Sequence, residues 1–380
     1  MLTRQLRFDS TTIDPEALAP LREIAPQLVL VFASVAHFEA GSFSAELRAA
    51  LPGTAWLGCS TAGEISASGV SDDSAIFTAI HFDHPDFRVA SATLDGMESS
   101  QAVGARLGAA LAAPDLKGVL VLGQGVDING SALIAGLVGQ VGTPVVIGGG
   151  LAGDAGRFSR SYVLSDTGSS SVTVVALGLY GTHLRLSHGS FGGWQAFGPL
   201  RQITRFEGNI LYELDGRPAL ELYRKYLGDH ADDLPASGLL FPFSMMSADA
   251  EEIGIIRTIL GVNSAEGSLI LAGDLIEGGF LRLMHASSDR LVDGAEIAAE
   301  RCRALAEHGR EGLALLVSCV GRKLVMGGRT EEEVEAVGRV LGDGFLVTGF
   351  YSNGEIGQGG DSGTCQLHNQ TMTITCLCEQ

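Results

Sequence analysis

The sequence predicts an α/β protein of two related mixed-sheet domains, each built from internally repeated β-α-β units. Three observations predict this class. The chain has 380 residues, and at roughly 150 residues per domain this length indicates two domains. It is 46% hydrophobic with 52 glycines, which indicates a compact, turn-rich protein that needs no disulfide or metal to fold. Blocks of strand, helix, strand and glycine-rich turn recur along the chain.

The clearest repeat joins two blocks of the N-terminal half, related by a gapless shift of 90 residues. The expected strands lie at 29–32, 55–59, 75–82 and 87–94 in the first block and at 119–122, 145–149, 172–180 and 183–187 in the second. A helix is expected at 102–112. We therefore expect an N-terminal domain over 1–190, with the repeat at 28–95 and 118–189.

The same order of elements returns near the C-terminus, with a strand, a helix, a strand and a last strand whose apolar residues alternate with threonines. These elements are expected at 313–319, 331–341, 345–348 and 371–378, and a weaker copy at 238–283. A glycine-rich aromatic stretch and a helix opened by Pro218 separate the halves. We expect a connecting segment over 191–235 and a C-terminal domain over 236–380.

Each of three copies ends in a turn with the pattern G-x-x-x-x-G followed by an acid, which is Glu64, Asp154 or Glu355. A phosphate loop needs Lys and Ser or Thr after its second glycine, and a carboxylate there repels phosphate, so nucleotide hydrolysis is not expected. The acid either fixes the turn by accepting backbone N–H bonds or receives a ligand amine. We expect the first role for Asp154 and leave both open for Glu64 and Glu355.

The third turn is the most polar of the three. We expect Glu355 to stand at a ligand pocket with Tyr351, Ser352 and Asn353, because a carboxylate, hydroxyls and an amide follow one another there.

Cys59 is a candidate nucleophile or pocket residue, because a thiol on a glycine turn after a strand can meet backbone N–H groups that lower its pKa. The matching positions hold Gly149 and Phe350, and no His-Asp pair can be read around it. A buried structural thiol is the alternative.

Three histidines are candidate haem ligands, of which one is expected to bind. His188 ends a predicted strand and leads into a glycine-rich stretch with Phe191 and Trp194, an apolar surround that suits a neutral imidazole. His368 precedes the last strand, and His37 follows the first strand of the repeat. A structural, hydrogen-bonded histidine is the alternative at each position.

The C-terminal cysteines allow a second kind of metal site. Cys365, His368, Cys376 and Cys378 combine thiols with an imidazole, as zinc or iron–sulfur sites do, although the spacing is not that of a zinc finger. Buried thiols are the alternative.

Charge and targeting signals restrict the partners. The formal net charge of −19 repels nucleic acid and anionic membranes, so neither is expected. The first residues do not form a secretory signal, and no apolar run approaches the ~20 residues of a spanning helix. We expect a cytoplasmic protein whose six cysteines are reduced. A homodimer is possible.

Several of these phrases together resemble the FIST family of bacterial sensory proteins, with an N-terminal and a C-terminal FIST domain. The phrases lie at 58–65, 213–220, 318–322, 349–356 and 367–371, in the family's order. The resemblance implies a signal-input protein that binds an amino-acid-like ligand and acts through a histidine kinase or a cyclic-dinucleotide enzyme, either a diguanylate cyclase or a phosphodiesterase. Layout and length are similar to those of stand-alone members that bind haem and sense nitric oxide. Trp194 stands where many members have cysteine, which fits a more apolar pocket.

Three functions therefore compete. The first is a haem-based nitric oxide sensor, in which a histidine holds the iron near the domain junction. The second is a haem-free sensor in which Glu64 or Glu355 pairs a ligand ammonium while turn N–H groups hold its carboxylate. The third is a hydrolase or transferase that depends on Cys59. We expect a non-enzymatic sensor.

Overall fold

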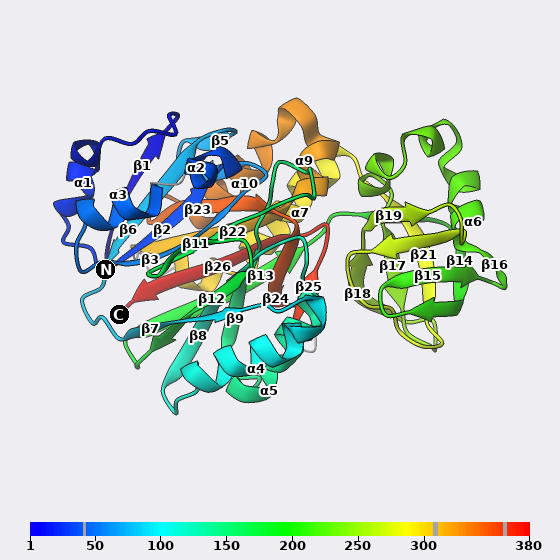
Figure 1. The fold of residues 1–380 in the computed structure, drawn as a ribbon, viewed down its shortest axis with the longest axis horizontal. Helices are drawn as coiled ribbons and strands as arrows, with labels where there is room; N and C mark the ends of the chain where they lie inside the picture. Colours follow the sequence, from blue (N-terminus) through cyan, green and yellow to red (C-terminus); the bar gives the residue numbers. More distant parts are fainter. Residues whose placement is uncertain (41–42, 307–310, 360–362) are drawn as a thin grey trace.

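The computed structural model describes residues 1–40, 43–306, 311–359 and 363–380. Three six-stranded sheets form a large body, and a fourth sheet forms a small barrel at one end (Figure 1). Helices cover the outer faces of the three sheets. The mixed α/β class expected from the sequence is confirmed.

The first unit consists of one β-α-β core and two added strands. Strands β2 and β3 pair in parallel, β6 pairs antiparallel with β2, and β1 pairs with β6. Strand β2 is buried on both faces, which is why its sequence is an unbroken apolar run. The elements are β1 (Leu2–Phe8), η1 (Pro15–Leu18), α1 (Ala19–Arg22), β2 (Leu28–Ala33), α2 (Val35–Glu39), α3 (Phe43–Ala50), β3 (Ala55–Ser60) and β6 (Ala75–His81).

The second unit has the same order of strands. Its sheet reads β7, β12, β8 and β9, with β8 and β9 parallel, as the first reads β1, β6, β2 and β3. Helices α4 and α5 pack on its outer face. The elements are β7 (Phe87–Thr93), η2 (Met97–Ser99), α4 (Ser100–Leu111), β8 (Leu116–Gly123), α5 (Gly130–Val141), β9 (Val146–Leu151) and β12 (Thr173–Tyr180).

A third unit repeats the order once more, as β13, β26, β22 and β23. Its first strand lies far from the rest in the sequence, because the barrel is inserted after β13. The elements are β13 (Leu184–Phe191), α7 (Ser288–Glu300), α8 (Arg303–Ala306), β22 (Gly312–Cys319), α9 (Val320–Met326), η5 (Gly327–Arg329), α10 (Glu331–Leu341), β23 (Phe345–Ser352) and β26 (Met372–Glu379).

Each unit also sends a hairpin to a neighbouring sheet. The first unit's hairpin completes the third sheet, the third unit's completes the second, and the second unit's completes the first. The hairpins are β4 (Glu64–Ser66) with β5 (Gly69–Ser71), β10 (Val163–Ser165) with β11 (Gly168–Ser170), and β24 (Gly354–Gln358) with β25 (Cys365–His368). This cyclic exchange joins the three units into one body.

The barrel occupies the interval between β13 and α7. Its strand order begins with β18 and ends with β19, which follow each other in the chain with only Thr258 between them, so the sheet curls on itself. The elements are β14 (Gln195–Glu207), β15 (Ile210–Leu214), β16 (Arg217–Pro218), α6 (Ala219–Leu227), η3 (Gly228–Asp233), η4 (Ala236–Leu239), β17 (Phe243–Met246), β18 (Glu252–Arg257), β19 (Ile259–Asn263), β20 (Ser268–Leu271) and β21 (Phe280–His285).

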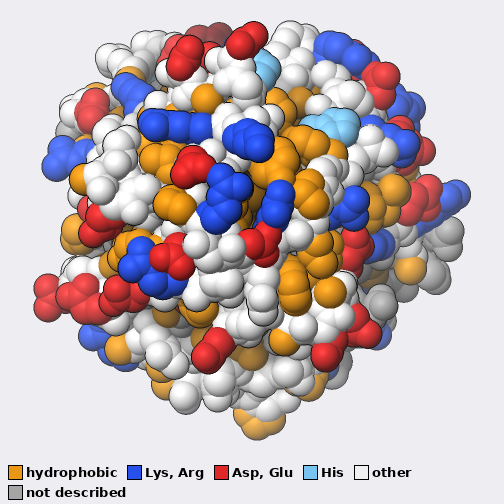
Figure 2. All heavy atoms as spheres, turned by 90° about the vertical axis from the view of Figure 1, so that its right-hand side faces the viewer, with side chains coloured by type: hydrophobic (Ala, Val, Ile, Leu, Met, Phe, Trp, Pro, Cys, Tyr) orange, Lys and Arg blue, Asp and Glu red, His pale blue; other side chains and the backbone are white. Residues whose placement is uncertain are grey.

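The cores follow from strand alternation. Inward-facing residues of the three sheets, such as Phe32, Leu177 and Phe350, form one shared core, and the outward-facing residues pack under the helices. The barrel has its own core. Figure 2 shows exposed apolar and basic side chains lying among one another at the barrel end of the molecule. The exposed large apolar residues of the barrel include Leu200, Leu260, Ile270 and Ile276.

The expected ranges 1–190, 191–235 and 236–380 cut across this layout. Strand β13, expected to close the N-terminal domain, pairs with the last strand β26, and the expected connecting segment forms part of the barrel. The repeat at 28–95 and 118–189 covers the β-α-β cores of two of the three units, but the last strand of each expected block, β7 or β13, belongs to the sheet of the next unit. No helix in the described residues has both the length and the apolarity that crossing a bilayer requires.

Candidate functional site

The best candidate site is a cavity of about 560 Å³ at the carboxyl ends of β2, β3 and β22, which we call the loop pocket. Its walls come from all three units. Residues 34–36 and 61–64 follow β2 and β3, Arg157 follows β9, and Lys323 lies on α9 after β22. Ligands of α/β proteins bind outside the carboxyl ends of strands, where successive loops diverge.

The loop pocket brings opposite charges together. Lys323 Nζ donates to the carbonyl oxygen of Ala62 at 2.8 Å, pairs with Asp72, and lies 5.4 Å from the centre of the Tyr351 ring. The Lys323 side chain is 17% exposed, whereas that of Asp72 is 66% exposed. Asp73 and Arg157 also line the cavity. The pocket can therefore offer a cation and an anion to one ligand.

Glu64 lines the same cavity but is itself buried. Its carboxylate accepts hydrogen bonds from Thr61 Oγ1, from the Ser74 backbone N–H at 3.0 Å and from Ser74 Oγ at 2.7 Å. Burial raises the pKa of Glu64 to about 7, against the opposing effect of these donors. Its main role in the structure is to fix the turn that forms the pocket wall.

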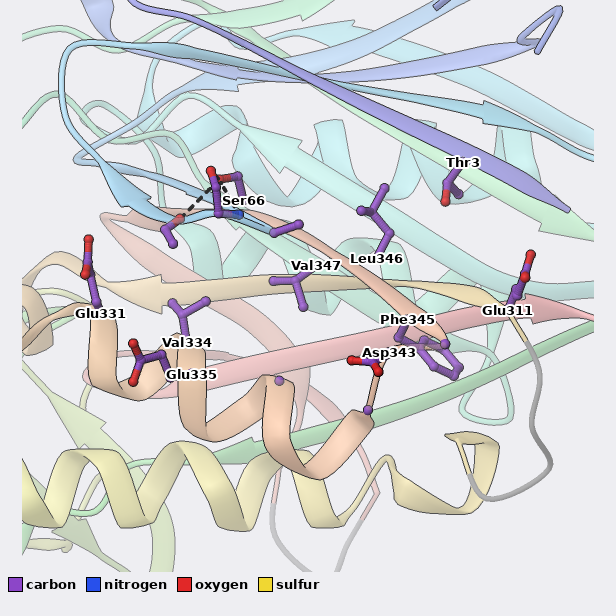
Figure 3. A pocket seen from close by; sticks show the side chains of 16 residues that line it. Thr3, Ser66, Glu311, Glu331, Val334, Glu335, Asp343, Phe345, Leu346 and Val347 are labelled. Atoms are coloured by element: carbon purple, nitrogen blue, oxygen red, sulfur yellow. Dashed lines mark hydrogen bonds between the residues drawn. The ribbon is translucent and has the colours of Figure 1, made fainter. Parts of the chain in front are cut away.

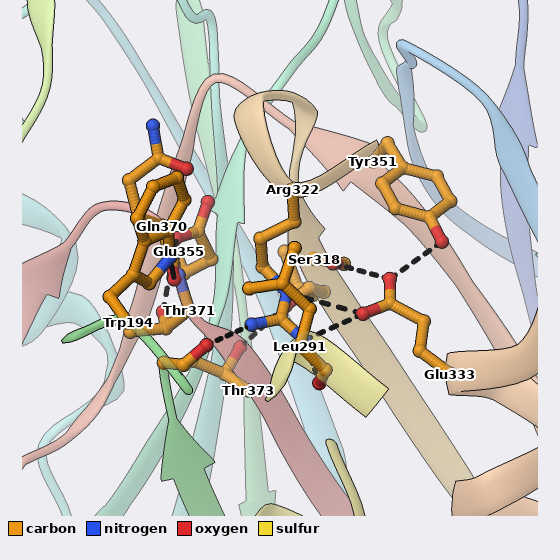
Figure 4. Close-up of polar contacts among 12 residues, drawn as sticks. Trp194, Leu291, Ser318, Arg322, Glu333, Tyr351, Glu355, Gln370, Thr371 and Thr373 are labelled. Carbon is orange, nitrogen blue, oxygen red and sulfur yellow. Dashed lines mark hydrogen bonds and ion pairs between the residues drawn. The ribbon is translucent and has the colours of Figure 1, made fainter. Parts of the chain in front are cut away.

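Glu355 repeats this arrangement in the third unit. It accepts from Ser352 Oγ at 2.6 Å and from Thr371 N–H and Oγ1 at 3.1 and 3.0 Å (Figure 4). It is fully buried, and burial raises its pKa to about 7. The three residues expected to converge with it do not all face one pocket, because alternate side chains of a strand point to opposite faces. Tyr351 donates to Glu333 at 2.6 Å, and Asn353 Nδ2 donates to Gly125 O at 3.2 Å.

Asp154 fixes its own loop, as expected. Its carboxylate accepts from the backbone N–H groups of Phe158, Ser159 and Arg160 at 2.9, 2.7 and 3.2 Å. It is not the counterpart of Glu64, however. In the sheet pairings, Glu64 lies opposite Phe350 of β23, and Glu355 lies opposite Gly150 of β9. The hairpin residue at the equivalent place of the second unit is Val163, which lies opposite Cys59 of β3.

Cys59 lies in the shared core with no solvent exposure. Burial raises the pKa of its thiol well above the usual value, so the thiolate that nucleophilic chemistry needs is disfavoured. The position of Cys59 is that of a buried structural thiol, the alternative considered from the sequence.

A second cavity, of about 260 Å³, lies where the barrel joins the body, and we call it the Trp194 pocket. The body contributes Arg301, His368 and Thr371, and the barrel contributes Glu252 and Met284. Trp194 stands between them in the chain segment that enters the barrel. Its indole Nε1 donates to Gln370 O at 2.8 Å (Figure 4).

In the described part of the chain, none of the three candidate haem ligands lines a cavity of haem size. His188 is half-buried: its Nδ1 lies 3.2 Å from Thr375 Oγ1, and its Nε2, which has no hydrogen-bond partner among the described residues, is enclosed against the backbone of Gly357. His37 contacts Ser34 Oγ and Ser10 O through its two ring nitrogens, at 3.0 and 3.1 Å.

His368 lines the Trp194 pocket, and its Nε2 lies 3.0 Å from Gly357 O. The cavity of about 260 Å³ is below the roughly 300–1,000 Å³ of usual ligand pockets. These residues, as placed, do not fit axial ligation of haem.

The mixed thiol and imidazole set is dispersed. Cys365 lies in the core under α4 and α5, whereas Cys376 and Cys378 lie in the core under α7 and α10. Within the described parts of the chain, no group of three or more His, Cys, Asp or Glu side chains could hold a metal ion.

A wider groove of about 660 Å³ runs along α10 beside β4 and β23 (Figure 3). The charged side chains that line it are acids, namely Glu311, Glu331, Glu335 and Asp343. We do not consider it a candidate site, because a cluster of acids on the surface does not by itself identify a ligand.

Sequence reasoning missed two basic residues, Arg322 and Lys323. Lys323 lies four residues after the end of its strand, as His37 and Asp127 do in the other units, so comparison of the three copies could have found it. Arg322 is fully buried and forms an ion pair of 2.6 Å with buried Glu333 (Figure 4). The sequence gives little indication of Arg322, because its burial depends on Glu333, a partner that lies 11 residues away.

Comparison with known proteins gives two kinds of match. The model of the FIST N domain matches residues 27–217, and the model of the FIST C domain matches residues 219–358. An uncharacterized protein of Methanocaldococcus jannaschii is 23% identical over 214 residues, which is 52% of this chain and 40% of that protein. The alignment thus spans less than half of that relative.

One solved structure that is similar over the whole chain is cyanuric acid hydrolase from A. caulinodans. The alignment covers 100% of this chain and 99% of the hydrolase, with 10% identity and a TM-score of 0.38. A likeness at this level supports no statement about fold or function.

Proposed function

Because the chain belongs to the FIST family, whose domains are sensory ligand-binding domains of signalling proteins, we propose that it senses a small amino-acid-like zwitterion bound in the loop pocket. The observation that carries the proposal is the meeting of Lys323 and Arg157 with Asp72 and Asp73 in one cavity.

The charges suit a ligand that carries an amine and a carboxylate. A ligand carboxylate would compete with Asp72 for Lys323, which is mostly buried and already oriented by Ala62 O. The released Asp72, together with Asp73, would then face the ligand amine. Charge-assisted hydrogen bonds of this kind contribute about 1.5–3 kcal/mol each.

Binding at this place would reach two units at once. Asp72 directly follows β5, and Glu64 begins β4. This hairpin belongs to the first unit in sequence but pairs with β23 of the third unit. A ligand that draws Asp72 away from Lys323 would therefore change the contact between the units, and this is the signal that we propose for the output partner. We expect that partner to be a histidine kinase, a diguanylate cyclase or a cyclic-dinucleotide phosphodiesterase.

Haem-based nitric oxide sensing, the other sensory function expected from the sequence, would use His368, the candidate ligand that lines the Trp194 pocket. It would require the pocket to widen and His368 to leave Gly357 O. An absorption spectrum of the protein as purified separates the candidates, because a Soret band accompanies bound haem. That the chain is not an enzyme stays a prediction, which the burial of Cys59 supports.

Calorimetric titration with glycine and alanine tests the loop pocket. We expect saturable binding that weakens at least tenfold when either ligand charge is blocked, as in glycinamide or N-acetylglycine. Lys323→Gln should weaken binding by a similar factor, since the amide can still donate to Ala62 O but carries no charge.

Arg329→Gln is the matched control. Arg329 is exposed and pairs with Asp289 and Glu332 outside the pocket, so its loss should leave affinity unchanged. Absence of zwitterion binding, or equal binding by the Lys323 variant, would overturn the proposal. A Soret band in the purified protein would favour haem.

A further inference from the structure

The Trp194 pocket is a cavity between the body and the barrel, which touch through a small apolar cluster and through polar contacts. The chain enters the barrel at Gly192 and Trp194 and leaves it near Ser287. Other contacts from body to barrel include Gln370 Nε2 to Leu239 O at 2.9 Å and Asn129 Nδ2 to Asp274 at 3.3 Å.

Both crossings of the chain are held by one side chain. Buried Arg322 donates to Gly192 O on the way into the barrel and to Leu291 O, at 2.8 Å, on the way back. Gly193, with a φ of 80°, packs directly against Arg290 O. The two crossings therefore lie side by side and are held at one fixed point.

The pocket itself carries charges of opposite sign on its two sides. Arg301, on the body, donates to Ser190 O at 2.5 Å and stacks over the Phe191 ring at 5.5 Å, which holds its guanidinium at the cavity. Glu252, on the barrel, is exposed and forms no ion pair in the described residues. A ligand with an anion and a cation could bridge them.

Between these charges the wall is apolar, with one neutral acceptor. Trp194, Ile256 and Met284 belong to one small apolar cluster, which also contains Leu291 and Met326 of the body. His368 is buried, which lowers its pKa to about 4, so the imidazole is neutral at physiological pH. Since Nε2 is engaged with Gly357 O, Nδ1 is left as an acceptor for a ligand N–H. A cavity of ~150 Å³ can hold benzene, so about 260 Å³ is enough for a ring with a short charged side chain.

We propose that the Trp194 pocket is a second binding site, for a small aromatic zwitterion that bridges the body and the barrel. Its carboxylate binds Arg301, its amine binds Glu252, and its ring packs against Trp194. This site is separate from the loop pocket, and it does not depend on the function proposed there.

Tryptophan fluorescence tests the proposal directly, because the chain has two tryptophans and Trp56 is buried in the core of the first unit. In Trp56→Phe only Trp194 remains. Titration with phenylalanine should change its emission saturably, whereas phenethylamine and 3-phenylpropionate, which each lack one charge, should bind at least tenfold more weakly. Calorimetry on the native chain provides the same comparison if Trp56→Phe does not fold.

Variants distinguish the two sites. Arg301→Gln and Glu252→Gln should each weaken phenylalanine binding at least tenfold, and Ala196→Phe should abolish it by filling the pocket. The matched control Arg303→Gln, two residues from Arg301 but paired with Glu300, should bind normally. Lys323→Gln should also leave phenylalanine affinity at this site unchanged.

Two outcomes would overturn the proposal. One is the absence of saturable phenylalanine binding to the native chain. The other is binding that Arg301→Gln, Glu252→Gln and Ala196→Phe leave intact but Lys323→Gln removes, which would place the aromatic ligand in the loop pocket.

Discussion

At the scale of single residues, Glu64 and Glu355 each fix a turn through the same set of hydrogen bonds. Each carboxylate accepts from a hydroxyl three residues earlier and from the N–H and hydroxyl of a residue at the start of the returning strand. Burial outweighs these donors and raises both pKa values to about 7. A turn that is fixed in this way is also sensitive to pH.

We therefore predict that stability falls as the pH rises from 5 to 8. The unfolded chain releases these protons near the ordinary value of 4.5, whereas the folded protein keeps them until about pH 7. Each group thus stabilises the fold fully below pH about 4.5 and loses that contribution as the pH rises through 7. The loss is on the order of 3 kcal/mol per carboxyl, at 1.36 kcal/mol per pKa unit. Urea unfolding at a series of pH values measures it.

Glu355→Gln isolates one of the two groups. The introduced amide is close in shape to the protonated acid and cannot ionise, so the variant should show a shallower fall in stability across the same pH range. A slope equal to that of the unchanged chain would contradict the assignment of this pH dependence to Glu355.

At the scale of elements, the parallel strand pairs of the three units depend on close backbone contact. Gly349 in β23 has a φ of 159°, and a Cβ there would meet the carbonyl oxygen of Leu316 in β22. Gly149 in β9 stands in the same relation to Val121 in β8. These glycines let β23 and β9 pass close to their parallel partners β22 and β8. The chain then continues to the next sheet.

We predict that Gly349→Ala destabilises the protein by more than about 2 kcal/mol, because the neighbour is backbone and cannot move aside. Gly338→Ala is the matched control. Gly338 lies in α10, where an added Cβ meets nothing within 4 Å, so this variant should gain about 0.5–1 kcal/mol. Thermal unfolding measures the stability of both variants. Equal stability of the two would refute the close-contact explanation.

At the scale of the whole molecule, the buried pair of Arg322 and Glu333 links the body to the barrel. Glu333 also accepts from Ser318 Oγ at 2.9 Å and from the Tyr351 hydroxyl, so the ion pair is joined to β22 and β23 (Figure 4). The guanidinium completes its bonds on the two chain crossings. Loss of this side chain should therefore loosen the barrel as well as lower stability.

We predict that Arg322→Met costs about 3–5 kcal/mol, because it leaves Glu333 buried without a partner. Amide hydrogen exchange should increase at 192–194 and 287–291 more than in the sheets of the body. The double variant Arg322→Met with Glu333→Gln should recover part of the stability but not the protection of the crossings. Arg217→Gln, which breaks an exposed pair with Glu221, should change stability by less than about 1 kcal/mol. Uniform exchange throughout the Arg322 variant would contradict a specific role at the crossings.

The sequence by itself determined the α/β class, the strands and helices of the repeat, the turn-fixing role of Asp154 and the family of the chain. These features depend on local alternation, apolar runs and glycine turns, which each segment carries whatever it packs against. The order of strands in space was decided only by the tertiary structure, because β13 and β26 pair across almost half of the chain. The same holds for the loop pocket. Lys323, Arg157 and Asp72 are far apart in sequence, and their charges meet only because three units exchange hairpins around one core.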